Sequence, residues 1–198
     1  AIDRAAWQCA QWQRQGWGIQ VAVNVPVTVI LEPRFVDHLR SVLARHPTRN
    51  GLIFEITESL FLSDYDRLSV LLNQIRSLGI GFSIDDFGTG HSSLSRLRRL
   101  PVSELKIDRS FVMDMEKCRD DLTIVESTIQ LAHNLGLLVV AEGVESEAAL
   151  QHLTRLGCDL VQGFHLGRPM PPEKVASFVR QSPWRVAGSD ATSRSANA

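Results

Sequence analysis

The sequence is poor in cysteine and lacks the features of secreted, membrane-spanning and nucleic-acid-binding proteins. Its three cysteines, Cys9, Cys118 and Cys158, form no CxxC pair, which excludes a disulfide framework and argues against a zinc ribbon. No apolar run approaches the roughly 20 residues that cross a bilayer, and the first residues do not resemble a signal peptide. The formal net charge is -1, so the chain has no overall field that attracts DNA, RNA or an anionic membrane. We therefore expect a cytoplasmic segment with reduced thiols and no membrane contact.

What is present is the composition of one globular domain. The 198 residues are 44% hydrophobic and 22% charged, which is ordinary for a folded domain. Residues 1–181 hold all of the periodic patterns and predict that domain. Residues 182–198 are rich in serine, alanine and small polar residues, and they predict a disordered C-terminal tail.

Short β-branched segments alternate with amphipathic segments of helical spacing. The predicted strands are 19–25, 52–57, 81–85, 104–108, 137–143 and 159–163. Strands separated by helices of about 10–15 residues predict parallel βαβ units. The near-continuous apolar character of the strands predicts that both faces of the sheet are buried. Two α/β architectures fit: an open doubly wound sheet, or part of a TIM-like (β/α)8 barrel. No GxGxxG follows a strand, so a dinucleotide-binding sheet has little support.

Polar residues stand at the C-terminal end of every predicted strand. In chain order they are Asn24, Glu55 and Glu58, Asp85 and Asp86, Lys106 and Asp108, Glu142 and Glu145, and Gln162. Because the strand ends of a parallel barrel converge on one mouth, contributions from all six strands favour the barrel. So many carboxylates repel one another unless cations neutralise them, and an oxygen-rich set suits Mg²⁺ or Mn²⁺ rather than zinc.

Each of these residues also has a purely structural interpretation. Asn24 and Gln162 are typical of turns, and the Asp85–Asp86 pair is typical of a helix N-cap. Glu142 could cap the helix that begins near residue 146. Glu55 lies in an apolar strand, where a carboxylate is costly to bury alone, and an ion pair with Lys106 would neutralise it.

Five motifs, found in the expected order, resemble the EAL domain family. They are EITES (55–59), DDFGTG (85–90), LKIDRSFV (105–112), AEGVES (141–146) and QGF followed by RP (162–164 and 168–169). The resemblance spans nearly everything from Cys9 to Gln181. It implies an enzyme that hydrolyses the bacterial second messenger cyclic di-GMP.

The resemblance also implies roles for single residues. The metal ligands would be Asn24, Glu55, Asp85, Asp86 and Glu142, with Asp85 bridging two Mg²⁺ or Mn²⁺ ions. The catalytic group would comprise Lys106, which contacts the attacking water, together with Glu142 and Gln162. Glu58 would anchor the loop after Asp86, Asp108 and Glu145 would lie near the metals, and Asp86 and Arg168 would contact substrate.

Three departures from the family pattern are visible. Pro26 stands where a serine is usual, and His91 stands where a tyrosine commonly follows the DDFGTG loop. The Glu-Ala-Leu motif that names the family is absent, and six βα units fall short of a barrel that typically takes about 250 residues. We therefore expect an N-terminally truncated barrel. Its exposed strand edges would favour a homodimer, and in the parent protein it would be fused to sensor or GGDEF-type domains.

The resemblance implies a two-metal hydrolysis that opens one linkage of cyclic di-GMP and gives linear pGpG. One alternative is a receptor that binds cyclic di-GMP without turnover, especially for a truncated chain. Another is an unrelated metal-dependent barrel enzyme that acts on a small phosphorylated or carbohydrate substrate.

Overall fold

A computed structural model describes residues 1–58, 64–88 and 94–184, and within them six strands form one sheet. The strands are β1 (Val21–Asn24), β2 (Leu52–Thr57), β3 (Ile80–Phe87), β4 (Glu104–Ile107), β5 (Leu138–Glu142) and β6 (Leu160–Gln162). All neighbouring pairs are parallel. Each strand therefore ends at the same edge of the sheet, which is the property on which the predicted site depends.

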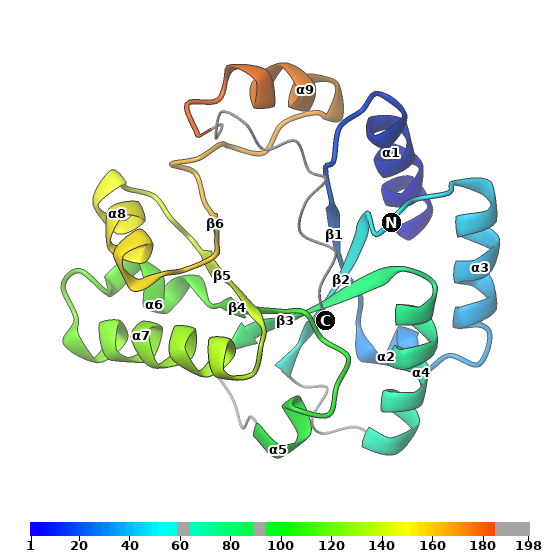
Figure 1. Cartoon of the computed structure of the whole chain (residues 1–198), viewed down its shortest axis with the longest axis horizontal. Helices are drawn as coiled ribbons and strands as arrows, with labels where there is room; N and C mark the ends of the chain where they lie inside the picture. The colour runs from blue at the N-terminus through cyan, green and yellow to red at the C-terminus, as the bar shows by residue number, and fades with distance from the viewer. Residues whose placement is uncertain (59–63, 89–93, 185–198) are drawn as a thin grey trace.

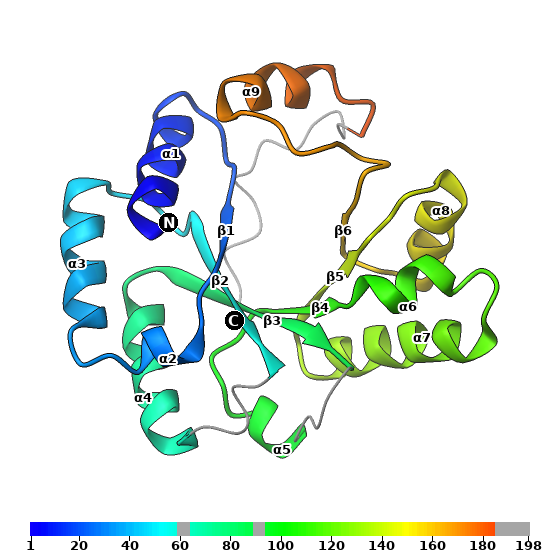
Figure 2. The same cartoon turned by 180° about the vertical axis from the view of Figure 1, so that it is seen from behind.

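The strand order decides between the two predicted architectures. The strands follow one another as β1-β2-β3-β4-β5-β6, without the reversal that defines a doubly wound sheet. The sheet curls, and its helices lie on the outside of the curl (Figures 1 and 2). Among the described strands, β1 and β6 do not pair with each other, so the curl is an unclosed half-barrel. Helix α9 lies between α1 and α8 on the side where the curl stays open (Figure 1).

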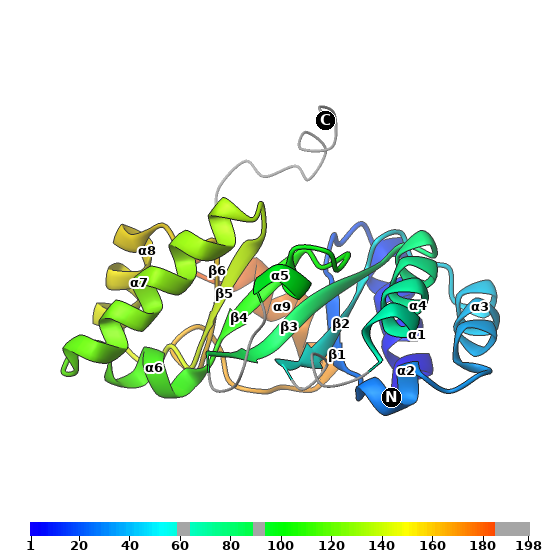
Figure 3. The ribbon, with the colours of Figure 1, turned by 90° about the horizontal axis from the view of Figure 1, so that it is seen from below.

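The outer layer of the half-barrel is formed by α1, which precedes the first strand, and by the helices that follow the strands. They are α1 (Ile2–Arg14), α2 (Val27–Ile30), α3 (Phe35–Arg45), α4 (Tyr65–Ser77), α5 (Leu94–Leu97), α6 (Arg109–Asp114), α7 (Arg119–Asn134), α8 (Glu147–Leu156) and α9 (Pro172–Gln181). Seen from below, α1 to α4 cover β1 to β3, while α6 to α8 cover β4 to β6 (Figure 3). None of the helices in the described ranges has the length and apolar character that a bilayer crossing requires.

The main core lies between the sheet and these helices. Alternate residues of β2 and β3 point outward into it, and the rings of Phe54 and Phe82 meet edge to face with centroids 6.1 Å apart. Phe35 of α3 packs on the other side of Phe54, at 6.3 Å. Since side chains alternate along a strand, the intervening residues Glu55 and Ser83 point to the inside of the curl. The polar residues of the strands therefore share the inner face.

The structure corrects several predictions. The inner face is not uniformly buried: Leu138 is 47% exposed and Leu160 is 44% exposed, because the described residues do not cover that side of β5 and β6. The short helices α2 and α6 were not predicted, since four and six residues are too few for a clear hydrophobic period. Predicted strand bounds differ by up to two residues at either end. Most of the predicted tail, from residue 185 on, lies outside the described residues.

Candidate active site

The centre of the strand-end region is a buried lysine that contacts three carboxylates. The Nζ atom of Lys106, on β4, lies 2.8 Å from Glu55 Oε1, 3.0 Å from Asp85 Oδ1 and 2.6 Å from Glu142 Oε1. The carboxylates come from β2, β3 and β5, which flank β4 in the sheet or lie one strand further. Segments separated by up to 87 positions in the chain thus meet at one point. The predicted ion pair between Glu55 and Lys106 is present, but it is part of a four-residue cluster.

Burial makes this cluster electrostatically strong. The side chain of Lys106 is 5% exposed, and those of its three partners are 12–19% exposed. Burial alone would lower the pKa of Lys106, but hydrogen bonds to Glu142 and Glu55 outweigh it and raise the pKa. Burial raises the pKa of Glu142, and the hydrogen bond from Lys106 opposes that rise in part. Lys106 is therefore a permanent cation near neutral pH, and Glu142 is a carboxylate with increased proton affinity.

A local irregularity of β3 positions the two adjacent aspartates. The pairing of β3 with β4 shifts register between Ile84 and Phe87, which is where Asp85 and Asp86 lie. Asp86 has φ of 56°, in the left-handed region, and its N–H donates to Asp85 Oδ1 at 3.1 Å. Bulges of this kind redirect side chains at the ends of strands. The alternative that this pair caps a helix is wrong, because both residues belong to β3 and α5 begins at Leu94.

Asp86 is also coupled to Asp108, at the end of β4. A side-chain hydrogen bond joins the two carboxyl groups; burial raises the pKa of Asp86, and the charges of Asp85 and Asp108 add to the rise. Burial would also raise the pKa of Asp108, but hydrogen bonds from Ser110 lower it. Asp108 caps α6 by accepting the Ser110 N–H at 2.9 Å. Ser110 was not predicted, although its spacing of two residues from Asp108 is the signal of such a cap.

The other predicted site residues divide into those near the cluster and those apart from it. Asn24 lies beside Glu55 in register, and Gln162 lies beside Glu142, so neither is a turn residue. Glu58 is 7% exposed and has an interaction partner, whereas Glu145 is exposed and forms no ion pair with Lys106.

Four further predictions concern Arg168, Glu142, Pro26 and His91. The guanidinium of Arg168 stacks over the ring of Phe164, with 4.8 Å from its Cζ to the centroid, and both residues are exposed. The alternative that Glu142 caps the next helix is wrong, because the Ser146 hydroxyl caps α8. Pro26 precedes α2 and is exposed. His91 lies outside the described residues.

The oxygen atoms of the cluster suit a hard divalent ion, but the ammonium of Lys106 already lies between them. The candidates are carboxylate oxygens with one amide, which Mg²⁺ and Mn²⁺ prefer. In the described parts of the chain, no three His, Cys, Asp or Glu side chains are arranged to hold a metal ion. The ammonium of Lys106 lies between three of the carboxylates and contacts one oxygen of each. A divalent ion would have to bind the remaining oxygens or displace some of these contacts.

A curled parallel sheet with an acidic, lysine-centred cluster at its C-terminal strand ends defines a TIM-barrel-like protein with its chemistry at the barrel mouth. The family assignment agrees with this geometry. The chain belongs to the EAL domain family, whose model, described as "EAL domain", matches residues 1–169.

Characterised relatives extend this result. Over 182 residues the chain is 46% identical to the bifunctional diguanylate cyclase/cyclic di-GMP phosphodiesterase MucR of Pseudomonas aeruginosa, covering 90% of this chain and 26% of that protein. It is 40% identical over 163 residues to the cyclic di-GMP phosphodiesterase NbdA of the same organism, covering 82% of this chain and 21% of NbdA. The chain thus spans about a quarter of the length of these curated relatives.

Solved structures give the same fold. A PaMucR phosphodiesterase in complex with c-di-GMP is 46% identical, with a TM-score of 0.82 over 87% of this chain and 71% of that chain. The EAL domain of Mycobacterium smegmatis DcpA is 36% identical, with a TM-score of 0.85 over 91% of this chain and 82% of that chain. The predicted TIM-like architecture is confirmed.

Proposed function

We propose that this chain is the catalytic part of a cyclic di-GMP phosphodiesterase, which opens one phosphodiester linkage and releases linear pGpG. The observation that carries the proposal is the convergence of Glu55, Asp85 and Glu142 on Lys106 at the strand ends. Two relatives named as cyclic di-GMP phosphodiesterases, MucR and NbdA, and a MucR structure titled as a c-di-GMP complex support the substrate.

Two Mg²⁺ or Mn²⁺ ions are part of the proposal. Asn24, Glu55, Asp85 and Asp86 would hold them, with Glu142 contributing to the second ion. Bound divalent ions would stabilise the negative charge that develops on the phosphate in the transition state. The carboxylates supply the anionic pocket, and Lys106 keeps them together until the ions enter.

The remaining chemistry belongs to side chains of the cluster. A water adds to the phosphorus, and the bond from phosphorus to the 3′ oxygen breaks. Glu142 is the suited proton acceptor, because burial raises its pKa toward neutrality. Lys106 stays protonated and would orient the water with an N–H released from one of its carboxylate partners. The departing 3′ oxygen takes a proton from the solvent and becomes a hydroxyl, and the proton that Glu142 took from the water returns to the solvent. Gln162, beside Glu142 in the sheet, would hold the same water with its amide.

Other parts of the proposal concern the parent protein. Because MucR is named as bifunctional and is much longer than this chain, we propose fusion to a GGDEF-type or sensor domain. The edges of β1 and β6, unpaired among the described strands, favour a homodimer. A cytoplasmic location is proposed because cyclic di-GMP is an intracellular messenger.

The test is an assay of the 198-residue chain with cyclic di-GMP, resolving pGpG by chromatography in Mg²⁺, Mn²⁺ or EDTA. We expect metal-dependent pGpG formation that is lost in Glu55→Gln, Asp85→Asn and Glu142→Gln. Glu126→Gln, an exposed glutamate on α7 outside the cluster, is the matched control and should retain activity. Binding of cyclic di-GMP without pGpG formation would favour the receptor alternative, and absence of both would refute the substrate assignment.

A further inference from the structure

Two glycines at the strand ends follow acidic residues of the proposed active site. Gly88 comes two residues after Asp86, and Gly143 comes directly after Glu142. Both have left-handed backbones, with φ of 101° and 74°. The short helix α6, which lies next to the end of β3 in Figure 3, packs against both of them. One helix therefore contacts the two segments that carry these acidic groups.

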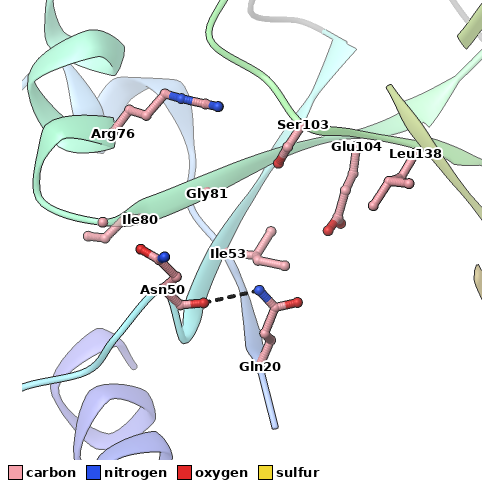
Figure 4. A pocket seen from close by; sticks show the side chains of 10 residues that line it. Gln20, Asn50, Ile53, Arg76, Ile80, Gly81, Ser103, Glu104 and Leu138 are labelled. Atoms are coloured by element: carbon pink, nitrogen blue, oxygen red, sulfur yellow. Dashed lines mark hydrogen bonds between the residues drawn. The ribbon is translucent and has the colours of Figure 1, made fainter. Parts of the chain in front are cut away.

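The strands β3, β4 and β5 are joined directly at their beginnings. The Ser103 N–H donates to the Phe82 carbonyl at 2.9 Å, and the Leu138 N–H donates to the Ser103 carbonyl at 3.0 Å. Figure 4 shows Ser103, Glu104 and Leu138 at this edge of the sheet. Backbone hydrogen bonds thus fix the relative positions of the three strands here without help from a helix.

The same strands are joined less directly at their ends. The pairing of β3 with β4 shifts register between Ile84 and Phe87. Asp85 and Asp86 lie within this stretch, and the backbone of Asp86 is left-handed. Because the regular ladder of hydrogen bonds is interrupted at a bulge, contacts from outside the sheet are needed to fix the two aspartates.

On one side, α6 contacts the end of β3 through Phe111. A Cβ atom at Gly88 would lie 3.3 Å from Cε2 of the Phe111 ring, so the ring packs on the Gly88 backbone itself. The ring is half-buried and packs against the main core. The Asp108 side chain caps α6, and the Asp108 carbonyl accepts the Phe111 N–H at 3.2 Å. Phe111 therefore supports the turn that follows Asp85 and Asp86.

On the other side, α6 lies against Gly143. A Cβ atom at Gly143 would lie 2.7 Å from Cβ of Arg109 and 3.5 Å from Cγ of Met113. The glycine has no side chain that could yield, so α6 cannot move toward β5 without overlap of backbone and Cβ atoms. The position of α6 is thus fixed by the segment that follows Glu142.

We propose that Phe111 is a positioning residue of the proposed active site. Helix α6 acts as a spacer between the Asp85–Asp86 segment of β3 and Glu142 of β5, and the Phe111 ring holds the aspartate pair where divalent ions bind. The metal part of this inference rests on the proposed function. The alternative is that Phe111 serves stability alone, which predicts a lower urea midpoint for its variants with unchanged metal affinity.

The first experiment measures Mn²⁺ binding to the 198-residue chain without substrate, with free Mn²⁺ followed by electron paramagnetic resonance. Phe111→Leu removes part of the ring contact with Gly88 and should weaken Mn²⁺ binding about tenfold, as the loss of groups that orient metal ligands typically does. Phe111→Tyr keeps the ring and should bind Mn²⁺ like the wild type. Phe178→Leu, a half-buried phenylalanine on α9 that packs against Gly167, is the matched control and should also leave Mn²⁺ binding unchanged.

The second experiment tests the contacts of α6 by NMR in EDTA, where neither metal nor substrate takes part. Gly143→Ala displaces Arg109 and should move the amide resonance of Gly88, and the movement should be smaller in a Phe111→Leu background. If Gly143→Ala does not fold, Arg109→Gly removes the same contact, and Arg109→Ala, which keeps the Cβ atom, is its control.

The outcomes separate this inference from the proposed function. Equal Mn²⁺ affinities of the wild type and Phe111→Leu would overturn the positioning role, as would a Gly88 resonance that does not respond to the changes at residues 109 and 143. A wild-type chain that binds no Mn²⁺ would refute the metal part of the proposed function and the role of Phe111 in it. The spectra in EDTA would then still decide whether α6 couples the two segments.

Discussion

Replacing Lys106 with methionine removes the positive charge that holds the cluster together while keeping a similar side-chain volume. The ammonium contacts Glu55, Asp85 and Glu142 within 3.0 Å, and its side chain is 5% exposed. In Lys106→Met the three carboxylates lose their common counter-ion and face one another in a largely buried site. The substitution therefore leaves negative charges without a counter-ion, and their burial limits how well water can solvate them.

The expected loss in the free energy of unfolding follows from the typical cost of breaking a buried ion pair. Removing one partner of such a pair costs about 3–5 kcal/mol, which for a domain of this size lowers Tm by roughly 6–20 °C. The pKa of Lys106 is raised in the folded state, so its stabilisation is fully present below its unfolded pKa of about 10.4 and is lost only as pH rises through the folded value. Measurements at pH 7 therefore report the full effect. Acid should reduce the loss, because the pKa of Glu142 is raised by burial and its protonation relieves the repulsion.

The assay is urea unfolding of the 198-residue chain in EDTA and again in excess Mg²⁺ or Mn²⁺. Lys117→Met, an exposed lysine, is the matched control and should unfold like the wild type. If the carboxylates accept divalent ions, the metal should stabilise Lys106→Met more than the wild type, since no ammonium competes. A variant that equals the wild type within about 1 kcal/mol in EDTA, with no added gain from metal, would refute this reasoning.

Three further substitutions test the scaffold of the half-barrel by urea unfolding. Gly163→Ala would place its Cβ 2.0 Å from the Val144 carbonyl oxygen, so we expect a loss of about 3 kcal/mol; a wild-type midpoint would contradict the close approach of these backbones. Ser146→Ala removes the N-cap of α8 and should cost about 1 kcal/mol, whereas Ser146→Asn should restore stability. Asp159→Asn breaks the 2.8 Å contact with His133 and should cost about 1 kcal/mol or less at pH 7. Burial would raise the pKa of Asp159, but the His133 hydrogen bond lowers it, so that difference should vanish as pH falls below about 3.9 and through the folded value. A stability difference between Asp159→Asn and the wild type that persists in acid would contradict this explanation.

The strands and their parallel order were predictable because they depend on local signals. β2 has the predicted bounds, since LIFEIT is apolar and β-branched apart from Glu55 and follows Gly51, and α9 begins at Pro172, where proline is favoured in the first turn. The polar residues at each strand end favoured a barrel over an open sheet, and the sequential strand order agrees. The exposure of Leu138 and Leu160 was not predictable, because it depends on which segments cover the inner face and not on the strands themselves.

The candidate site was predictable in its members but not in its arrangement. The spacing of Glu55, Asp85 and Glu142 places them at the strand ends, yet it does not reveal that one lysine contacts all three. The left-handed backbone of Asp86 and its contact with Asp108 depend on a register shift between β3 and β4. Phe111 received no functional role, because an aromatic residue in a short helix is ordinary in sequence. Only the folded chain brings its ring against Gly88. The roles of the metal ligands and of Arg168 stay predictions.

The most direct test is the crystal structure of this chain grown with Mn²⁺, with the ions located by anomalous diffraction. We expect two Mn²⁺ ions at the strand ends, roughly 2.1 Å from oxygens of Glu55, Asp85 and Asp86, with some carboxylate oxygens turned away from Lys106. A map with no manganese there, and with Lys106 still bound to all three carboxylates in excess Mn²⁺, would contradict it.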